Sequence, residues 1–187
     1  RLALFENMFP LPNGVAYNSY LIRDEKVAVL DTVDAAVTRT FLDNVDGALQ
    51  GRGVDYLVVQ HMEPDHCAAI TELCHRFPAM RIVGNAKTFQ LLRQFYELDV
   101  ESRLLEVKER DTLPLGEHTL RFLFAPMVHW PEVMFTYEER DKLLFTADAF
   151  GAFGALSGNL FSDQLDFDGV FLDEARRYYV NIVGKYG

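Results

Sequence analysis

Cysteine is scarce in this chain of 187 residues, which contains only two. Two cysteines cannot build the disulfide framework that stabilises many small secreted domains. Cys67 and Cys74 also lie seven positions apart on one face of a segment with helical spacing. We therefore expect two buried thiols, which suits a reducing compartment, the cytoplasm.

Long apolar runs and positive charge are also in short supply. No stretch reaches the roughly 18 apolar residues that a membrane-spanning helix needs, and the first residues show no signal-peptide pattern. Lys and Arg number 18 against 28 Asp and Glu, so the formal net charge is −10, and the basic residues are scattered. This balance argues against a nucleic acid or an anionic membrane as a partner.

An initial methionine is missing as well, because the chain begins with Arg1 inside a strand-like run and stops at Gly187 after a helical segment. We expect a fragment of a longer polypeptide. Hydrophobic residues make up 49% of the chain and charged residues 25%, as in a globular protein. The length fits one domain or most of one, and no repeat or linker interrupts it.

Hydrophobic periodicity predicts the order of elements. Strands are expected at residues 1–9, 17–22, 26–31, 54–59, 81–84, 104–107, 119–125, 134–137 and 143–146. Helices are expected at 32–49, 66–77 and 173–183, and from the N-cap Asn85 to about residue 95, with an irregular segment at 154–169. Because strands dominate after an alternating start, two sheets with outer helices are more plausible than one doubly wound sheet.

Four groups that can ligate a metal occur within six consecutive residues. His61, Glu63, Asp65 and His66 follow the apolar run at 54–59 and precede a helix that begins at about Asp65 or His66, with Pro64 between them. The carboxyl ends of strands in open α/β sheets are where such proteins place their sites. A polar connecting loop would not need two histidines, so this spacing predicts a metal site.

Further candidate ligands come after other predicted strands. His129 follows the strand at 119–125, and Asp148 follows the strand at 143–146. Asp31 also closes a strand, and we interpret it as a residue that orients a ligand. His75 and His118 lack this context and are expected on the surface or on a helix face.

The resulting pattern, His61-x-Glu63-x-Asp65-His66 followed by His129 and Asp148, resembles the H-x-[HE]-x-D-H…H…D motif of the metallo-β-lactamase superfamily. Glutamate at the second position, followed by Pro-Asp-His, is similar to the flavodiiron proteins (A-type flavoproteins). The resemblance extends over nearly the whole chain. It includes the segments at 12–21, 129–130, 146–151 and 174–182.

The resemblance implies an αββα metallo-β-lactamase-like sandwich that is incomplete at its C-terminus and occupies residues 1–187. It implies two iron ions: one bound by His61, Glu63 and His129, the other by Asp65 and His66, with Asp148 as the bridge. His66 has a second possible state, swung away from its metal. A carboxylate in place of an imidazole makes the site harder and more negative, which independently favours iron over zinc.

The implied reaction is reduction of O2 to water or of NO to N2O, with electrons from FMN. Trp130 is expected to line the pocket or face the flavin, and Tyr178 or Tyr179 to donate a hydrogen bond to the substrate; core packing is the alternative for all three. The resemblance also implies a homodimer or tetramer, a flavodoxin-like domain on a neighbouring subunit, and a rubredoxin-like or flavin electron donor.

The chain departs from the family pattern because it ends before the last histidine ligand and before the FMN-bearing domain. We therefore expect the fragment alone to be inactive, although its parent is an enzyme. Two alternatives stay open: a dinuclear zinc hydrolase for thioesters or phosphoesters, and a scaffolding module without chemistry. Glu63 counts against the hydrolase, as does the lack of a basic patch or a Gly-rich loop.

Overall fold

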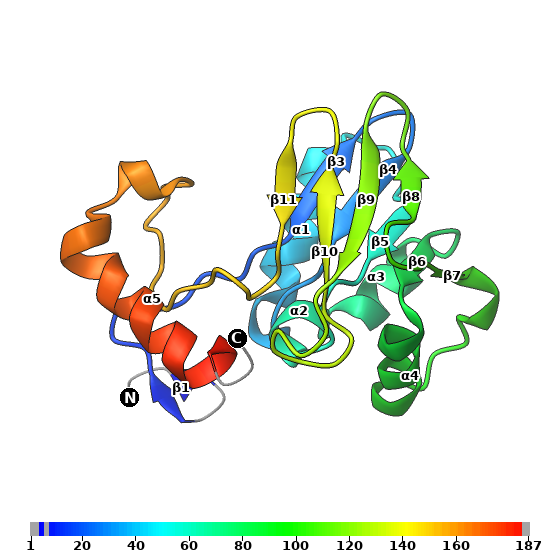
Figure 1. Ribbon diagram of the computed structural model, residues 1–187. Coiled ribbons are helices and arrows are strands. Elements are labelled where there is room, and N and C mark those ends of the chain that lie inside the picture. Colours follow the sequence, from blue (N-terminus) through cyan, green and yellow to red (C-terminus); the bar gives the residue numbers. More distant parts are fainter. Residues whose placement is uncertain (1–3, 6–7, 185–187) are drawn as a thin grey trace. The chain divides into compact units, whose positions relative to one another are not determined.

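The computed structural model describes residues 4–5 and 8–184 (Figure 1). The chain forms two compact units. Residues 17–147 make up the larger unit, and residues 1–16 and 148–187 the smaller one.

The larger unit contains two sheets. The first has the order β3-β4-β5-β6-β7, in which β4 to β7 are parallel and β3 is antiparallel. The second is antiparallel, with the order β11-β10-β9-β8. The strands are β3 (Tyr20–Arg23), β4 (Val27–Leu30), β5 (Tyr56–Val58), β6 (Arg81–Gly84), β7 (Leu104–Glu106), β8 (Thr112–Pro114), β9 (Thr119–Phe124), β10 (Met134–Glu138) and β11 (Leu143–Phe145). The predicted two-sheet arrangement is therefore confirmed.

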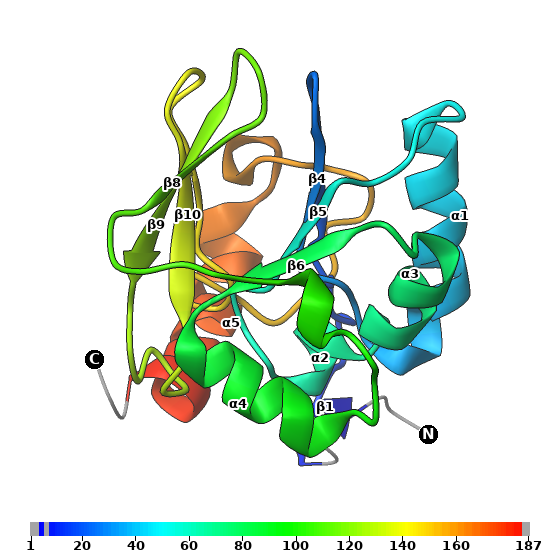
Figure 2. The same ribbon diagram turned by 90° about the vertical axis from the view of Figure 1, so that its right-hand side faces the viewer.

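Helices cover the outer face of the five-stranded sheet (Figure 2). They are α1 (Thr38–Leu49), α2 (Pro64–Cys67), α3 (Ile70–Arg76) and α4 (Ala86–Phe95), with short 3-10 turns η1 (Ala35–Val37) and η2 (Glu101–Arg103). Strand β4 shows how the layers are built, because its side chains alternate between the faces of the sheet. Val27 and Val29 pack in the core formed with the helices, whereas Ala28 and Leu30 pack in the core formed with the second sheet.

The smaller unit contains the antiparallel pair β1 (Leu4–Phe5) and β2 (Phe9–Pro10) and a C-terminal helical region. That region comprises η3 (Ser162–Gln164), the π-helical segment η4 (Phe167–Phe171), α5 (Leu172–Tyr178) and the π-helical segment η5 (Tyr179–Val183). Phe153 is fully buried and centres the packing. Its ring lies 5.6 Å from that of Phe5 and 5.0 Å from that of Tyr178.

The helix predicted at 66–77 is wrong in one respect: it is divided into α2 and α3. Thr32 causes the break. Its hydroxyl donates to the carbonyl of His66 (2.9 Å) and accepts from the Ala69 N–H (3.2 Å), and its own N–H donates to the same His66 carbonyl (2.7 Å). These bonds occupy backbone groups that a continuous helix would pair internally.

Other boundaries also differ from the predictions. Residues 4–5 and 9–10 form a short antiparallel pair rather than part of one long strand, and residues 1–3 and 6–7 lie outside the described part. The helix expected from Thr32 becomes α-helical only at Thr38, because Asp34 caps the 3-10 turn η1 first. Strand β8 was not predicted, since it is only three residues long and ends in proline. The N-cap role of Asn85 is confirmed: its side chain accepts from Lys87 N–H and Thr88 N–H.

Two predictions from composition can be compared directly with the structure. Cys67 and Cys74 are both buried and free, as expected. Among the residues described, none of the helices combines the length and the apolar character needed to cross a membrane.

Candidate metal centre

The loop after β5 supplies the first group of candidate ligands. Asp31, at the end of the neighbouring strand β4, holds this loop: its Oδ1 accepts from Gln60 N–H (2.7 Å) and its Oδ2 from Gln60 Nε2 (3.1 Å). The next residues along the chain include His61 and Glu63, whose exposed fractions are 0% and 3%. A strand-end aspartate thus fixes the backbone that presents two buried ligands.

Pro64 sets the transition from loop to helix. It is the first residue of α2, where its fixed φ suits the helix and its missing N–H costs nothing. Glu63 is the N-cap residue in extended conformation, while Asp65 and His66 fall in the first turn. The proline therefore separates Glu63 from Asp65 and His66 by a change of backbone direction, which fits their predicted assignment to two different metal ions.

The other sheet contributes His129 from the loop between β9 and β10. Three backbone hydrogen bonds close this loop: Ala125 N–H to Val133 O (2.9 Å), Met127 N–H to Trp130 O (2.8 Å) and Val128 N–H to Ala125 O (3.1 Å). His129 is 6% exposed. The loop is thus an ordered turn that holds His129 facing the loop after β5.

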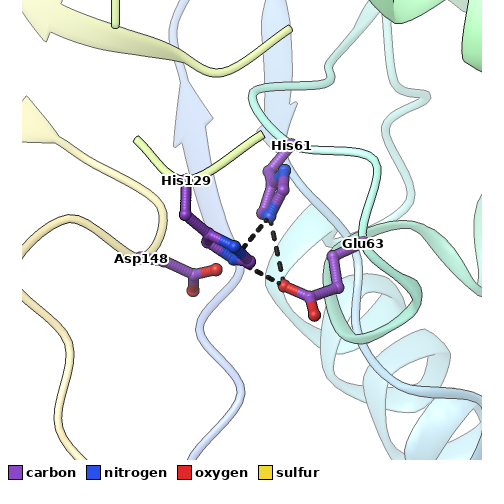
Figure 3. A group of neighbouring side chains, drawn as sticks. All are labelled: His61, Glu63, His129 and Asp148. Atoms are coloured by element: carbon purple, nitrogen blue, oxygen red, sulfur yellow. Dashed lines mark hydrogen bonds and ion pairs between the residues drawn. The ribbon is translucent and has the colours of Figure 1, made fainter. Parts of the chain in front are cut away.

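Three side-chain atoms converge on one point between these loops (Figure 3). Glu63 Oε2 lies 3.2 Å from His61 Nε2 and 2.9 Å from His129 Nε2, and the two nitrogens are 3.4 Å apart. A transition metal about 2.1 Å from each ligand atom places neighbouring ligand atoms about 3.0 Å apart in an octahedron and about 3.4 Å apart in a tetrahedron. The spacing of the three atoms therefore fits a shared metal ion.

Asp65 and His66 form a second pair beside the first group. His66 Nε2 lies 3.8 Å from Asp65 Oδ2, and the ring centroids of His61 and His66 are 5.3 Å apart. On its other side, His66 Nδ1 lies 3.5 Å from Asp31 Oδ2, which fits the interpretation of Asp31 as an orienting residue. The larger unit thus contains candidate ligands for two neighbouring ions.

The remaining predicted site residues have different surroundings. Asp148 belongs to the smaller unit, where it begins the second of the two segments, and its role as a bridge stays a prediction. Tyr178, in the same unit, packs its ring against Phe153, and its catalytic role also stays a prediction. The Trp130 ring packs nearly perpendicular to the His61 ring, with centroids 5.3 Å apart at 89°, so it borders the candidate ligands.

Two histidines, His75 and His118, are not predicted to be ligands. His75 is exposed, as expected. His118 is partly buried at a turn, where its Nδ1 lies 2.9 Å from Asp24 Oδ2. Neither is part of the cluster of candidate ligands.

Cys67 directly follows His66, but its thiol is directed toward the Met62 carbonyl and is not one of the clustered candidate ligands. Burial raises the pKa of its thiol to about 11, so the sulfur stays protonated at neutral pH. Its S–H donates to the Met62 carbonyl (3.2 Å), and the Tyr96 hydroxyl donates to the Cys67 carbonyl (2.8 Å). The candidate ligand set is therefore made of imidazoles and carboxylates alone.

Sequence reasoning missed one residue of the site, Glu132. This carboxylate is fully buried and lies 2.8 Å from His61 Nδ1. The available signal was weak: an acidic residue three positions after a predicted ligand, in an otherwise apolar loop. Nothing in the spacing indicated that it contacts His61, which is far away in the sequence.

Comparison with known proteins identifies the family. The model of the ODP family beta lactamase matches residues 15–174. The chain belongs to this family. The predicted metallo-β-lactamase-like fold class is thereby confirmed.

The chain is similar in sequence to several flavoproteins. The chain is 37% identical over 174 residues to the anaerobic nitric oxide reductase flavorubredoxin of Salmonella typhi. The aligned residues make up 92% of this chain and 36% of that relative. The chain is 38% identical over 148 residues to the diflavin flavoprotein A 1 of Synechocystis sp., covering 79% of this chain and 26% of the relative.

Solved structures of related proteins are also similar to this chain. The flavodiiron protein of Giardia intestinalis superposes with a TM-score of 0.90 at 30% identity, covering 98% of this chain and 44% of that one. The rubredoxin oxygen:oxidoreductase of Desulfovibrio gigas also gives 0.90, at 32% identity, covering 97% and 45%. This chain thus spans less than half the length of these relatives.

Proposed function

We propose that this chain is the diiron domain of an oxidoreductase that reduces O2 to water, NO to N2O, or both, with electrons from FMN. The observation that carries the proposal is the position of Glu63 Oε2 between His61 Nε2 and His129 Nε2. A carboxylate in this position gives a harder, more negative site than a third imidazole, which favours iron over zinc. The names of the relatives, which include a nitric oxide reductase and an oxygen:oxidoreductase, support the same reaction class.

Each ligand has a proposed role. His61, Glu63 and His129 would hold one iron, Asp65 and His66 would hold the second, and Asp148 would be a ligand shared by both. When bound, the iron pair supplies the redox capacity and the coordination positions for the diatomic substrate. The chain's own contribution is to orient these ligands and to exclude water, since His61, Glu63 and His129 are almost fully buried.

Two aromatic residues complete the proposed site. Trp130 walls it from the side of the β9–β10 loop, with its ring nearly perpendicular to that of His61. Tyr178 donates a hydrogen bond to the bound substrate. Replacing Tyr178 with Phe separates this role from packing, because the ring contact with Phe153 is retained while the hydroxyl is lost.

Electron supply is proposed to come from outside these 187 residues. The relatives named flavorubredoxin and diflavin flavoprotein are more than twice as long as the segments that match this chain. We assign the FMN to a flavodoxin-like domain of a neighbouring subunit in a homodimer or tetramer, with a rubredoxin-like or flavin protein as its donor. The chain alone is then expected to bind iron but not to turn over.

Metal analysis followed by an activity measurement tests this proposal. Protein purified without added metal is expected to contain about two irons per chain by elemental analysis. With a reduced FMN-bearing flavodoxin partner it is expected to consume O2 or NO, measured with an electrode, and without the partner it should not. Zinc in place of iron, together with thioester or phosphoester hydrolysis, would overturn the proposal in favour of a dinuclear zinc hydrolase.

A further inference from the structure

We propose that Glu132 is a positioning residue that fixes the tautomer of His61 and thereby keeps its Nε2 available for the metal. The inference rests on the proposed function, because it concerns a ligand of the proposed diiron site. It differs from that function in naming the residue that prepares the ligand before any ion arrives.

The side chain of Glu132 makes two short contacts through a single oxygen. Its Oε1 lies 2.8 Å from His61 Nδ1 and accepts a hydrogen bond from Met62 N–H, also at 2.8 Å. Both Glu132 and His61 are 0% exposed. Water is thus excluded from this contact, and the two residues determine each other's hydrogen bonding.

This arrangement decides which His61 nitrogen carries the proton. A carboxylate oxygen has two lone pairs, and one of those on Oε1 is used by Met62 N–H. The second faces His61 Nδ1, which must therefore be the donor. In the neutral ring this leaves Nε2 with its lone pair, directed toward Glu63 Oε2 and His129 Nε2.

The backbone at Glu132 and at the next residue, Val133, is held by hydrogen bonds. The Glu132 backbone carbonyl accepts from Asn85 Nδ2 (2.6 Å), and Asn85 Oδ1 accepts from Lys87 N–H and Thr88 N–H at the start of α4. The neighbouring Val133 carbonyl accepts from Ala125 N–H (2.9 Å). The position of Glu132 is therefore fixed by groups that persist when its side chain is replaced.

The β9–β10 loop consequently acts on two ligands at once. It carries His129 directly, and through Glu132 it orients His61, which belongs to the loop after β5 of the other sheet. Partners of this kind behind a metal-binding histidine typically change metal affinity 10–100-fold when removed. A purely structural Glu132, present only to accept the Met62 N–H, would leave the His61 proton unaffected.

The decisive experiment measures the His61 tautomer in the metal-free protein by 15N NMR, at a pH high enough for the ring to be neutral. In the wild type we expect the proton on Nδ1. In Glu132→Ala we expect it to move to Nε2, where Glu63 Oε2 lies 3.2 Å away as an acceptor. A proton on Nε2 in the wild type, or an unchanged Nδ1 proton in folded Glu132→Ala, would overturn the inference.

Two further variants keep the test clear of misfolding. Glu132→Gln is isosteric, and the Met62 N–H selects the amide orientation that places oxygen at the former Oε1, so the His61 proton should stay on Nδ1. Glu138→Gln is a matched control: Glu138 is 1% exposed, accepts from the Arg140 and Asp141 N–H groups, and lies at the end of β10 opposite the loop that carries His129. A change of the His61 tautomer in Glu138→Gln would contradict a specific role for Glu132.

Metal titration gives the second readout. Competition with a chelator should show Fe(II) binding weakened about 10–100-fold in Glu132→Ala, less in Glu132→Gln and not in Glu138→Gln. If the wild type takes up zinc but no iron, the proposed function fails while the tautomer result still decides the role of Glu132. If the tautomer is insensitive to Glu132 while iron loads normally, only the inference fails.

Discussion

The carboxylate of Asp31 lies 3.5 Å from Nδ1 of His66, and both residues are almost fully buried. Asp31 has a φ of 54°, a left-handed conformation that aspartate and asparagine tolerate better than most residues. The same carboxylate accepts from Gln60. One strand-end residue therefore supports both the loop that carries His61 and the helix turn that carries His66.

Asp31→Asn should weaken binding of the metal ion assigned to Asp65 and His66, while lowering the free energy of unfolding only slightly. Asparagine keeps the left-handed backbone and an acceptor for the Gln60 N–H, but it removes the negative charge beside His66. After unbound iron is removed, we expect about one iron per chain instead of two, with a stability loss of about 1 kcal/mol. Elemental analysis and urea denaturation measure the two effects.

Asp34→Ala is the matched control, because Asp34 is a partly exposed aspartate that likewise accepts a backbone N–H, from Ala36. It should leave the metal content unchanged. Equal loss of metal in both variants would contradict the role of Asp31.

Glu63→His should change the metal preference of the site from iron toward zinc. The variant replaces the carboxylate between His61 Nε2 and His129 Nε2 with an imidazole, giving a softer and less negative ligand set. In protein purified from cells grown with both metals, the ratio of bound zinc to bound iron is expected to rise several-fold. Glu63→Gln separates charge from ligand type, since it keeps an oxygen ligand without the charge. An unchanged ratio in Glu63→His would show that the preference is set elsewhere.

Thr32→Val should destabilise the larger unit by about 1–3 kcal/mol, because it leaves the buried Ala69 N–H without the hydroxyl that accepts it. The shape of the side chain is retained, so the loss reports the hydrogen bonds and not a cavity. Thr32→Ser keeps the hydroxyl and removes one methyl group, for an expected cost of about 1 kcal/mol. Urea denaturation of the metal-free protein compares the two. A larger loss in the serine variant would assign the effect to packing.

His118 should make stability depend on pH. Its hydrogen bond to Asp24 raises the pKa of His118 in the folded protein, with the charges of Glu138, Asp24 and Asp141 acting in the same direction. The stabilisation is therefore fully present below the ordinary histidine pKa of about 6.5 and is lost as the pH rises through the raised value. In His118→Gln the fall in stability over this range should be smaller, as measured by urea denaturation at several pH values with metal removed.

The exposed His75 provides the control, and His75→Gln should keep the wild-type pH dependence. Asp24 adds a second pH dependence of stability, in the acid range. Hydrogen bonds from His118, first from its backbone N–H, lower the pKa of Asp24. That contribution is lost as the pH falls through the lowered value and should largely remain in His118→Gln. A wild-type slope above pH 6.5 in His118→Gln would exclude this histidine as the source.

The sequence was sufficient for the features that depend on neighbours along the chain. The ligands His61, Glu63, Asp65 and His66 could be recognised because they share one turn, and the two-sheet order followed from runs of apolar residues. The Asn85 cap was likewise a local signal. These are features in which the residues that matter stand next to each other in the chain.

The features that were missed depend on partners distant in sequence. Glu132 meets His61 across 71 positions, and Thr32 divides the helix through a bond to Ala69 across 37 positions. Strand β8 is too short to show a period of its own and is defined by its pairing with β9. Single-sequence patterns contain no information about such pairings, because they arise only when the sheets pack.

The three converging ligand atoms come from both sheets of the larger unit. His61 and Glu63 follow β5 of the five-stranded sheet, and His129 follows β9 of the four-stranded sheet. A metal ion bound by all three ligand atoms would therefore cross-link the two sheets at the edge where these loops meet. Since a ligand at 100 times its Kd adds about 2.7 kcal/mol to the free energy of unfolding, the supply of metal is expected to set how stably the two sheets of the larger unit stay packed.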